Sequence, residues 1–219
     1  MSIGKSEEIA SLIVSHISRD VILAIEEALI VGAKRAFNRC NGIHDGHITS
    51  ALGQMRHFEM NQAFFSTLET HNICSTYLRG NEIVVGKSGM LNIARFTAND
   101  DKWNSARRSQ ARKKLAKCNV QLETLVYPDL FADQHIEPSS GTIFFVTCFS
   151  GSMENSPDKP IRVQVAVCDS DMKQWLFIED ISKFVDRYIV TSTCDANNTV
   201  EDLVKPKLKK HIKRGTNNE

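Results

Sequence analysis

The sequence lacks closely spaced cysteines, although its 219 residues include six cysteines. Zinc knuckles and C-x-x-C redox pairs both need cysteines a few residues apart, so neither kind of site is expected. The six are spread along the chain: Cys40, Cys74, Cys118, Cys148, Cys168 and Cys194. This spacing predicts buried or half-buried free thiols in a reducing compartment.

Long apolar runs are also missing. The first apolar stretch, residues 9–17, is interrupted by Ser11, Ser15 and His16, and the charged pair Arg19 and Asp20 follows soon after it. A secretory signal or a membrane-spanning helix needs an unbroken apolar run. We therefore expect a cytoplasmic protein with no membrane partner.

The common catalytic motifs are absent, since the chain contains no H-E-x-x-H, G-x-S-x-G or G-x-G-x-x-G pattern. The stretch from Gly80 to Ser88 resembles a phosphate-binding Walker A loop, but five residues separate Gly80 from Gly86 where that loop has four. The residues that follow favour a strand, whereas the loop must lead into a helix. A hairpin turn is therefore the preferred interpretation, and no catalytic residue or cofactor is assigned.

Two histidines, His44 and His47, flank Asp45 at the expected start of a helix. Such a cluster is compatible with a metal ion, but no third ligand is evident nearby. Asp45 or Thr49 as a helix cap explains part of the cluster without any chemistry. We therefore expect no metal site.

The composition, with 42% apolar and 24% charged residues, is typical of a folded globular domain. Apolar spacing predicts helices over residues 7–37, with a break at 18–20, and over 48–68, the second apolar on nearly all sides and therefore buried. The later segments predict, in order, a hairpin over 82–96, a long helix over 102–125, a second hairpin from strands 142–149 and 161–167, a strand over 174–178 and a helix from 181.

Strands that arrive in adjacent pairs favour an antiparallel sheet covered by helices. We therefore predict an α+β fold in which a helical N-terminal half packs with antiparallel β-hairpins and a long basic helix. Residues 1–204 form a single domain, with the helical part at about 1–70 and the hairpin and helix part at about 80–190. Residues 205–219 form a mobile basic tail.

Charge is strongly segregated, although the net charge is only +1. Seven basic and no acidic residues lie in 102–117, and six basic and no acidic residues lie in 205–214. The rest of the chain holds 14 basic and 26 acidic residues. A basic tail of this kind either finds a polyanion or keeps the protein soluble.

On the long helix, a rotation of 100° per residue places Arg108 on the buried stripe with Ala111, Cys118 and Leu122. Arg107 and Arg112 flank this stripe. A buried guanidinium needs a partner, which is either an internal carboxylate or a bound phosphate. The internal candidates are Asp129, Glu123 and Glu59. The candidate anion- or nucleic-acid-binding residues are Arg56, Arg107, Arg108, Arg112, Lys113 and Lys117.

Three functions remain open. The first is a non-enzymatic nucleic-acid-associated or phosphate-binding protein with low sequence specificity, because phosphate contacts position a protein without reading bases. The second is an enzyme acting on a phosphate-bearing substrate, such as a nuclease, in which His57 or a carboxylate handles protons. The third is an interaction or regulatory module, in which the acidic C-terminal half covers the basic segment of a second copy. DNA, RNA, a protein partner and a homodimer are therefore all open as partners.

Overall fold

The helices α1 (Ile3–His16) and α2 (Arg19–Arg39) open the chain of this computed structural model, which describes residues 3–99, 107–127, 138–150 and 156–189. Ser18 separates the two helices, because its side chain accepts a hydrogen bond from the backbone N–H of Val21 and caps α2. The predicted break in the first helical segment is confirmed.

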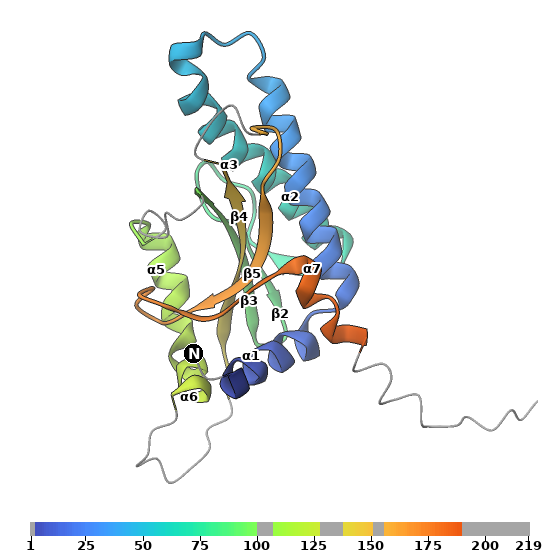
Figure 1. Ribbon diagram of the computed structural model, residues 1–219, viewed down its shortest axis with the longest axis vertical. Coiled ribbons are helices and arrows are strands. Elements are labelled where there is room, and N and C mark those ends of the chain that lie inside the picture. The colour runs from blue at the N-terminus through green and yellow to red at the C-terminus, as the bar shows by residue number, and fades with distance from the viewer. Residues whose placement is uncertain (1–2, 100–106, 128–137, 151–155, 190–219) are drawn as a thin grey trace, which may run out of the picture.

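Helix α3 (Asp45–Thr70) packs antiparallel to α2, and the two form a hairpin that reaches beyond the sheet at the top of Figure 1. Its cap is the imidazole of His44, which accepts a hydrogen bond from the N–H of Gly46 at 3.2 Å, and neither Asp45 nor Thr49 has this role. The prediction that α3 is buried all round is wrong, because Phe58 is 40% exposed. The first half of α3 packs its Leu52 into a small apolar cluster at the end of the hairpin, separate from the two cores of the sheet.

Six strands form one mixed sheet in sequence order, which agrees with the predicted α+β class. The strands are β1 (Cys74–Ser75), β2 (Val85–Ser88), β3 (Leu91–Asn99), β4 (Gly141–Phe149), β5 (Arg162–Cys168) and β6 (Trp175–Asp180). Both predicted hairpins are present, but β3 and β4 are parallel along their whole length, so the sheet is not purely antiparallel. A parallel pair needs a long crossover connection, and here helices supply it.

That crossover contains α5 (Gln110–Ala116), a 3-10 turn (Lys117–Asn119) and α6 (Val120–Val126). The single helix predicted over 102–125 is therefore interrupted, and α5 begins only after its cap Ser109. Asn119 fixes the turn, since its buried amide donates to the carbonyls of Thr142 and Cys168 and accepts from the N–H of Thr142. Residues 102–106 lie outside the described residues.

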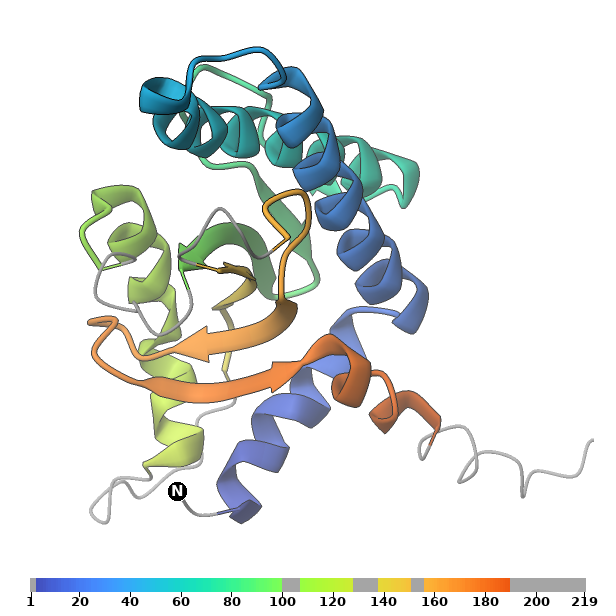
Figure 2. The same cartoon turned by 45° about the horizontal axis from the view of Figure 1, so that its top comes forward.

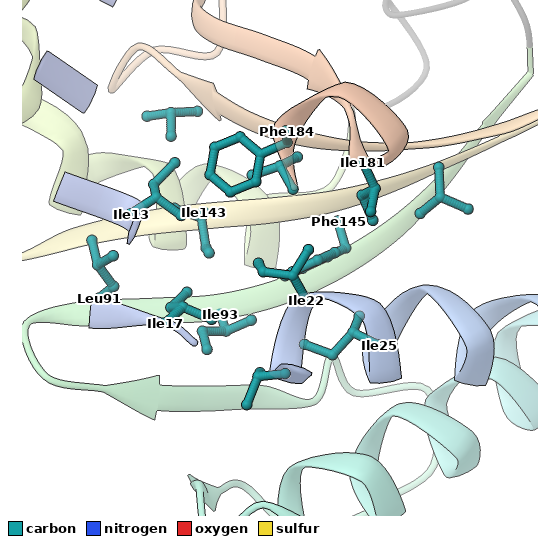
Figure 3. Packing of buried hydrophobic residues seen from close by; sticks show 14 of the residues in the cluster. Ile13, Ile17, Ile22, Ile25, Leu91, Ile93, Ile143, Phe145, Ile181 and Phe184 are labelled. Atoms are coloured by element: carbon teal, nitrogen blue, oxygen red, sulfur yellow. The ribbon is translucent and has the colours of Figure 1, made fainter. Parts of the chain in front are cut away.

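The two faces of the sheet hold separate cores. On one face, the apolar side chains of α1, α2 and α7 (Ile181–Phe184) pack against β3, β4 and β5, as Figure 3 shows for Ile22, Ile93 and Phe145. On the other face, α5 covers a second core around Phe96 and Phe144. Figure 2 shows the strands between α5 on one side and α2 on the other.

Five of the six cysteines are described, and all five are free thiols. Cys40, Cys148 and Cys168 are buried, whereas Cys74 is exposed, which corrects the expectation of buried or half-buried thiols throughout. Cys194 and the basic tail 205–219 lie outside the described residues. Within the described ranges, none of the helices is both long enough and apolar enough to cross a membrane.

The helices α2 and α3 approach each other closely at Gly32. A Cβ atom at this position would lie 2.8 Å from the Cα of Met60 and 3.0 Å from the carbonyl oxygen of Glu59. Only a glycine fits without moving the α3 backbone. Gly32 therefore sets the position of the part of α3 that carries Glu59, Met60 and Asn61.

We expect Gly32→Ala to destabilise the fold by about 1 to 3 kcal/mol, because the added methyl overpacks this contact. Gly53→Ala is the matched control, since a Cβ at Gly53 on the exposed side of α3 meets nothing within 4 Å. That control should stabilise the helix by up to about 1 kcal/mol. Denaturant unfolding of both variants measures the difference, and a stabilising effect of Gly32→Ala would contradict the close approach.

Candidate functional site

Strand β3 is longer than its neighbour β2, and a pocket lies beside the uncovered part of its edge. The pairing with β2 stops at Ala94, so within the described chain no strand covers the edge of β3 from Arg95 to Asn99 on that side. A cavity of about 160 Å³ occupies this place. Its lining residues lie on α3, on the segment before β2, on β3 and on α5. They are Gly53, His57, Asn61, Ile83, Arg95, Phe96, Thr97 and Arg112.

Arg95 forms the floor of this pocket. Leu91, Ile93 and Arg95 share one face of β3, so the guanidinium points toward α3 and is only 4% exposed. Its Nε donates to Oδ1 of Asn61 at 2.8 Å, and one terminal nitrogen donates to the carbonyl of His57 at 2.8 Å. The other terminal nitrogen donates to the hydroxyl of Thr97 and contacts the sulfur of Met60.

These acceptors are all neutral, so no described carboxylate compensates the charge of Arg95. Burial, together with the nearby charge of Arg112, lowers the pKa of Arg95 to about 9. The group is still protonated near neutral pH. A fully buried cation held only by neutral groups is costly, and a bound anion would remove most of that cost.

Arg112 enters the pocket from the opposite face of the sheet. Helix α5 covers the Phe96 face, and the guanidinium of Arg112 lies 4.8 Å from the centre of the Phe96 ring. Burial lowers the pKa of Arg112. The two arginines approach each other around the uncovered edge of β3, which β2 would otherwise occupy.

His57 and Asn61 complete the polar lining from α3. They lie one helical turn apart, with 3.3 Å between Nε2 of His57 and Nδ2 of Asn61. Burial lowers the pKa of His57, and the charges of Arg95 and Arg112 lower it further, whereas a hydrogen bond to the backbone of Asn81 acts in the opposite direction. The imidazole is therefore neutral near pH 7.

Three of the predicted residues lie elsewhere, around the β5–β6 turn. The hydrogen bond to Asp171 is the main cause of the raised pKa of Lys173. The positive charge of Arg107 is close enough to Lys173 to lower that pKa slightly. The same hydrogen bond to Lys173 is the main cause of the lowered pKa of Asp171. The positive charges of Lys113 and Lys117 lower this pKa further. These cations therefore form a mixed charged surface and not part of the pocket.

The expectation for Arg108 is wrong, because this residue is exposed. It precedes the cap Ser109, so the helical rotation that placed it on the buried stripe does not apply there. The 3-10 turn after α5 also changes the rotation, and Ala111 is exposed as well. Two of its proposed partners are engaged elsewhere: Glu59 pairs with Arg39 at 2.8 Å, and Glu123 accepts from the N–H of Ser170. Asp129 lies outside the described residues.

Arg56 lies on a different side of α3 from the pocket. Its guanidinium stacks 3.8 Å from the centre of the Phe149 ring and donates to the carbonyl of Pro157. Its Nε is buried and has no hydrogen-bond partner among the described residues. Burial lowers the pKa of Arg56 to about 10. This residue therefore joins α3 to the segment after β4.

Neither motif considered from the sequence forms a ligand site in the described structure. His44 caps α3, and its ring lies 6.5 Å from that of His47. Among the described residues, no three histidine, cysteine or acidic side chains come together as a metal-binding group. Gly86, Lys87 and Ser88 of the Walker-like stretch belong to β2, so the predicted hairpin is present, but these residues lie in its first strand and the turn is at Gly89.

Comparison with known proteins adds no relative: no family model, no curated protein and no solved structure matches this chain.

The sequence analysis missed Arg95 and Thr97 as site residues. One signal was present, because strand alternation puts Arg95 on the same face as the apolar Leu91 and Ile93. A charged residue on an apolar strand face is unusual enough to mark a site. The proximity of Arg95 to Arg112 could not be predicted from the sequence, because the parallel crossover between β3 and β4 brings the two residues together.

The lowered pKa of His57 predicts a loss of stability in acid. Its ordinary value is 6.5, so on acidification the unfolded chain takes up this proton before the folded chain does. The unfolding free energy should therefore fall between about pH 7 and about pH 5, and less steeply in His57→Gln. His47→Gln, at an exposed position of the same helix, is the matched control in denaturant titrations. Equal slopes for wild type and His57→Gln would contradict the prediction.

Proposed function

We propose that this protein binds a phosphate-bearing ligand through the pocket of Arg95, Arg112, His57, Asn61 and Thr97. The observation that carries the proposal is the fully buried guanidinium of Arg95, whose partners are all neutral. A guanidinium donates charge-assisted hydrogen bonds to phosphate oxygens, and such bonds are among the strongest in proteins. A second guanidinium, that of Arg112, lines the same cavity.

Binding without chemistry is the preferred form of this proposal. The described lining contains no carboxylate, so a general acid–base pair or a metal-assisted step has no second group there. The enzyme alternative has one observation in its favour, which is a neutral imidazole, His57, between two guanidinium groups. A neutral imidazole in that position is able to accept a proton from a bound substrate.

Nucleic acid is one source of such phosphates. Basic residues outside the pocket lining, Lys113 and Lys114 of α5 and Lys117 of the following 3-10 turn, provide contacts to a nucleic-acid backbone, and contacts of that kind carry little sequence specificity. The alternative in which the acidic half of a second copy covers this surface, giving a homodimer, also remains a proposal. We further propose a reducing, cytoplasmic location, because the five described cysteines are free thiols.

Titration calorimetry with inorganic phosphate tests the pocket directly. Arg112→Gln should weaken binding about 10- to 100-fold, because a hydrogen bond to a charged group contributes about 1.5 to 3 kcal/mol. Arg95→Lys, which keeps the charge but loses the fork, should weaken it by a similar factor. Arg108→Gln, at an exposed arginine outside the lining, is the matched control and should bind like wild type.

Saturating phosphate should also raise the thermal midpoint of the wild-type protein and leave that of Arg112→Gln nearly unchanged, because only a ligand of the folded state stabilises it. If wild type binds no phosphate at low salt, while circular dichroism shows it folded, the proposal is wrong.

A salt series with labelled single- and double-stranded DNA and RNA tests the nucleic-acid alternative. If the α5 surface contacts the backbone, affinity should fall steeply with salt, and Lys113→Gln with Lys117→Gln should reduce the slope of log affinity against log salt by about 2. Lys34→Gln with Arg35→Gln, at two exposed basic positions on α2, lowers the net charge by the same amount and is the matched control. Binding of no probe at low salt would exclude nucleic acid as the ligand.

A further inference from the structure

A second hollow adjoins the arginine pocket. It has a volume of about 520 Å³ and is lined by Ser50, Gly53, Gln54, His57 and Asn81. Gly53 and His57 line both spaces, so the two are neighbours on the same side of α3. A ligand with a phosphate beside Arg95 therefore has room for an attached group in the second hollow.

The lining of this second hollow includes the neutral polar side chains of Ser50, Gln54 and Asn81, each of which offers a hydrogen-bond donor and an acceptor. Hydroxyl groups of a ligand fit these side chains, because each hydroxyl can both donate to them and accept from them.

The wall formed by residues 81–82 is held against α3 by the pocket residues themselves. Asn61 donates its amide to the carbonyl of Glu82 at 3.2 Å, and His57 hydrogen-bonds to the backbone of Asn81. Asn61 also accepts from Arg95, so one side chain supports both the phosphate pocket and this wall. The two hollows are therefore parts of one hydrogen-bonded structure.

Gly53 lies at the boundary between the two hollows. It is exposed within α3, and the space where its Cβ would stand is empty to 4 Å. A glycine inside a helix costs about 1 kcal/mol relative to alanine, and packing against neighbours gives no reason for one here. An open passage between the two spaces gives a reason, since any large side chain at this position would narrow it.

From this geometry we infer that the ligand is a phosphate monoester of a small polyhydroxylated molecule. Its phosphate lies between Arg95 and Arg112, and its hydroxyl-bearing body passes Gly53 and meets Ser50, Gln54 and Asn81. This inference rests on the proposed function and adds the class of ligand to it.

Calorimetry with three probes tests the assignment: inorganic phosphate, ribose 5-phosphate and phenyl phosphate. Ribose 5-phosphate should bind wild type at least about tenfold more tightly than inorganic phosphate does, because two or three additional hydrogen bonds each contribute about 0.5 to 1.5 kcal/mol. Phenyl phosphate should gain no such advantage. Gly53→Leu should remove the advantage of ribose 5-phosphate, because a large side chain at this position closes the passage between the two hollows.

Ser50→Ala combined with Gln54→Ala should reduce the affinity for ribose 5-phosphate but not the affinity for inorganic phosphate, because both residues line only the second hollow. This variant does not depend on whether the fold accepts a large side chain at position 53. Gln62→Leu, at an exposed position about two and a half turns further along α3, is the matched control for a new leucine.

The outcomes separate the two proposals. If wild type binds none of the three probes, the phosphate pocket itself fails. If inorganic phosphate binds but ribose 5-phosphate is no tighter, or phenyl phosphate is the tightest, the polyhydroxylated body is wrong while the phosphate site stands. A 5′-phosphorylated oligonucleotide that binds much more tightly than ribose 5-phosphate would also overturn the small-molecule assignment in favour of nucleic acid.

Discussion

The parallel pairing of β3 with β4 is the constraint on which the other features depend. Parallel neighbours cannot be joined by a tight turn, so the chain must cross one face of the sheet before it returns as β4. That crossover places α5 over the Phe96 face and brings Arg112 to the edge of β3. Because β2 begins only at Val85, which pairs with Ala94, the same edge is left open toward α3 beyond Ala94. The pocket is therefore a direct consequence of topology.

The burial of Arg95 is the most costly feature of this arrangement. A leucine or isoleucine at this position would continue the apolar face of β3 and would stabilise the core. Instead, the chain orients Asn61, Thr97 and the carbonyl of His57 so that each accepts from the guanidinium. Three neutral acceptors satisfy its geometry but leave its charge uncompensated. A fold that keeps such a group gives up stability for a site, which is a common feature of binding and active sites.

Much of the fold could be predicted from local patterns. The helices over 3–39 and 45–70, the turn at Gly89 and the strands β4, β5 and β6 all follow from apolar spacing and from turn residues. Local patterns did not give the direction of β4 relative to β3, because the apolar pattern of a strand is the same whether the strand pairs in parallel or antiparallel. The 3-10 turn at Lys117–Asn119 was missed for a similar reason, since it is fixed by the bonds of Asn119 to β4 and β5.

The site shows why a cluster of charge along the chain is a poor guide to a cluster in space. Arg107, Arg108 and Arg112 are neighbours in sequence, yet the first lies near Lys173, the second is exposed and only the third lines the pocket. Each arginine points where its local backbone directs it, and a helix cap separates the second from the third. Arg95, isolated among apolar residues, has no such freedom and must be buried with its strand. An isolated charge within an apolar strand is therefore better evidence for a binding pocket than a run of charges on a helix.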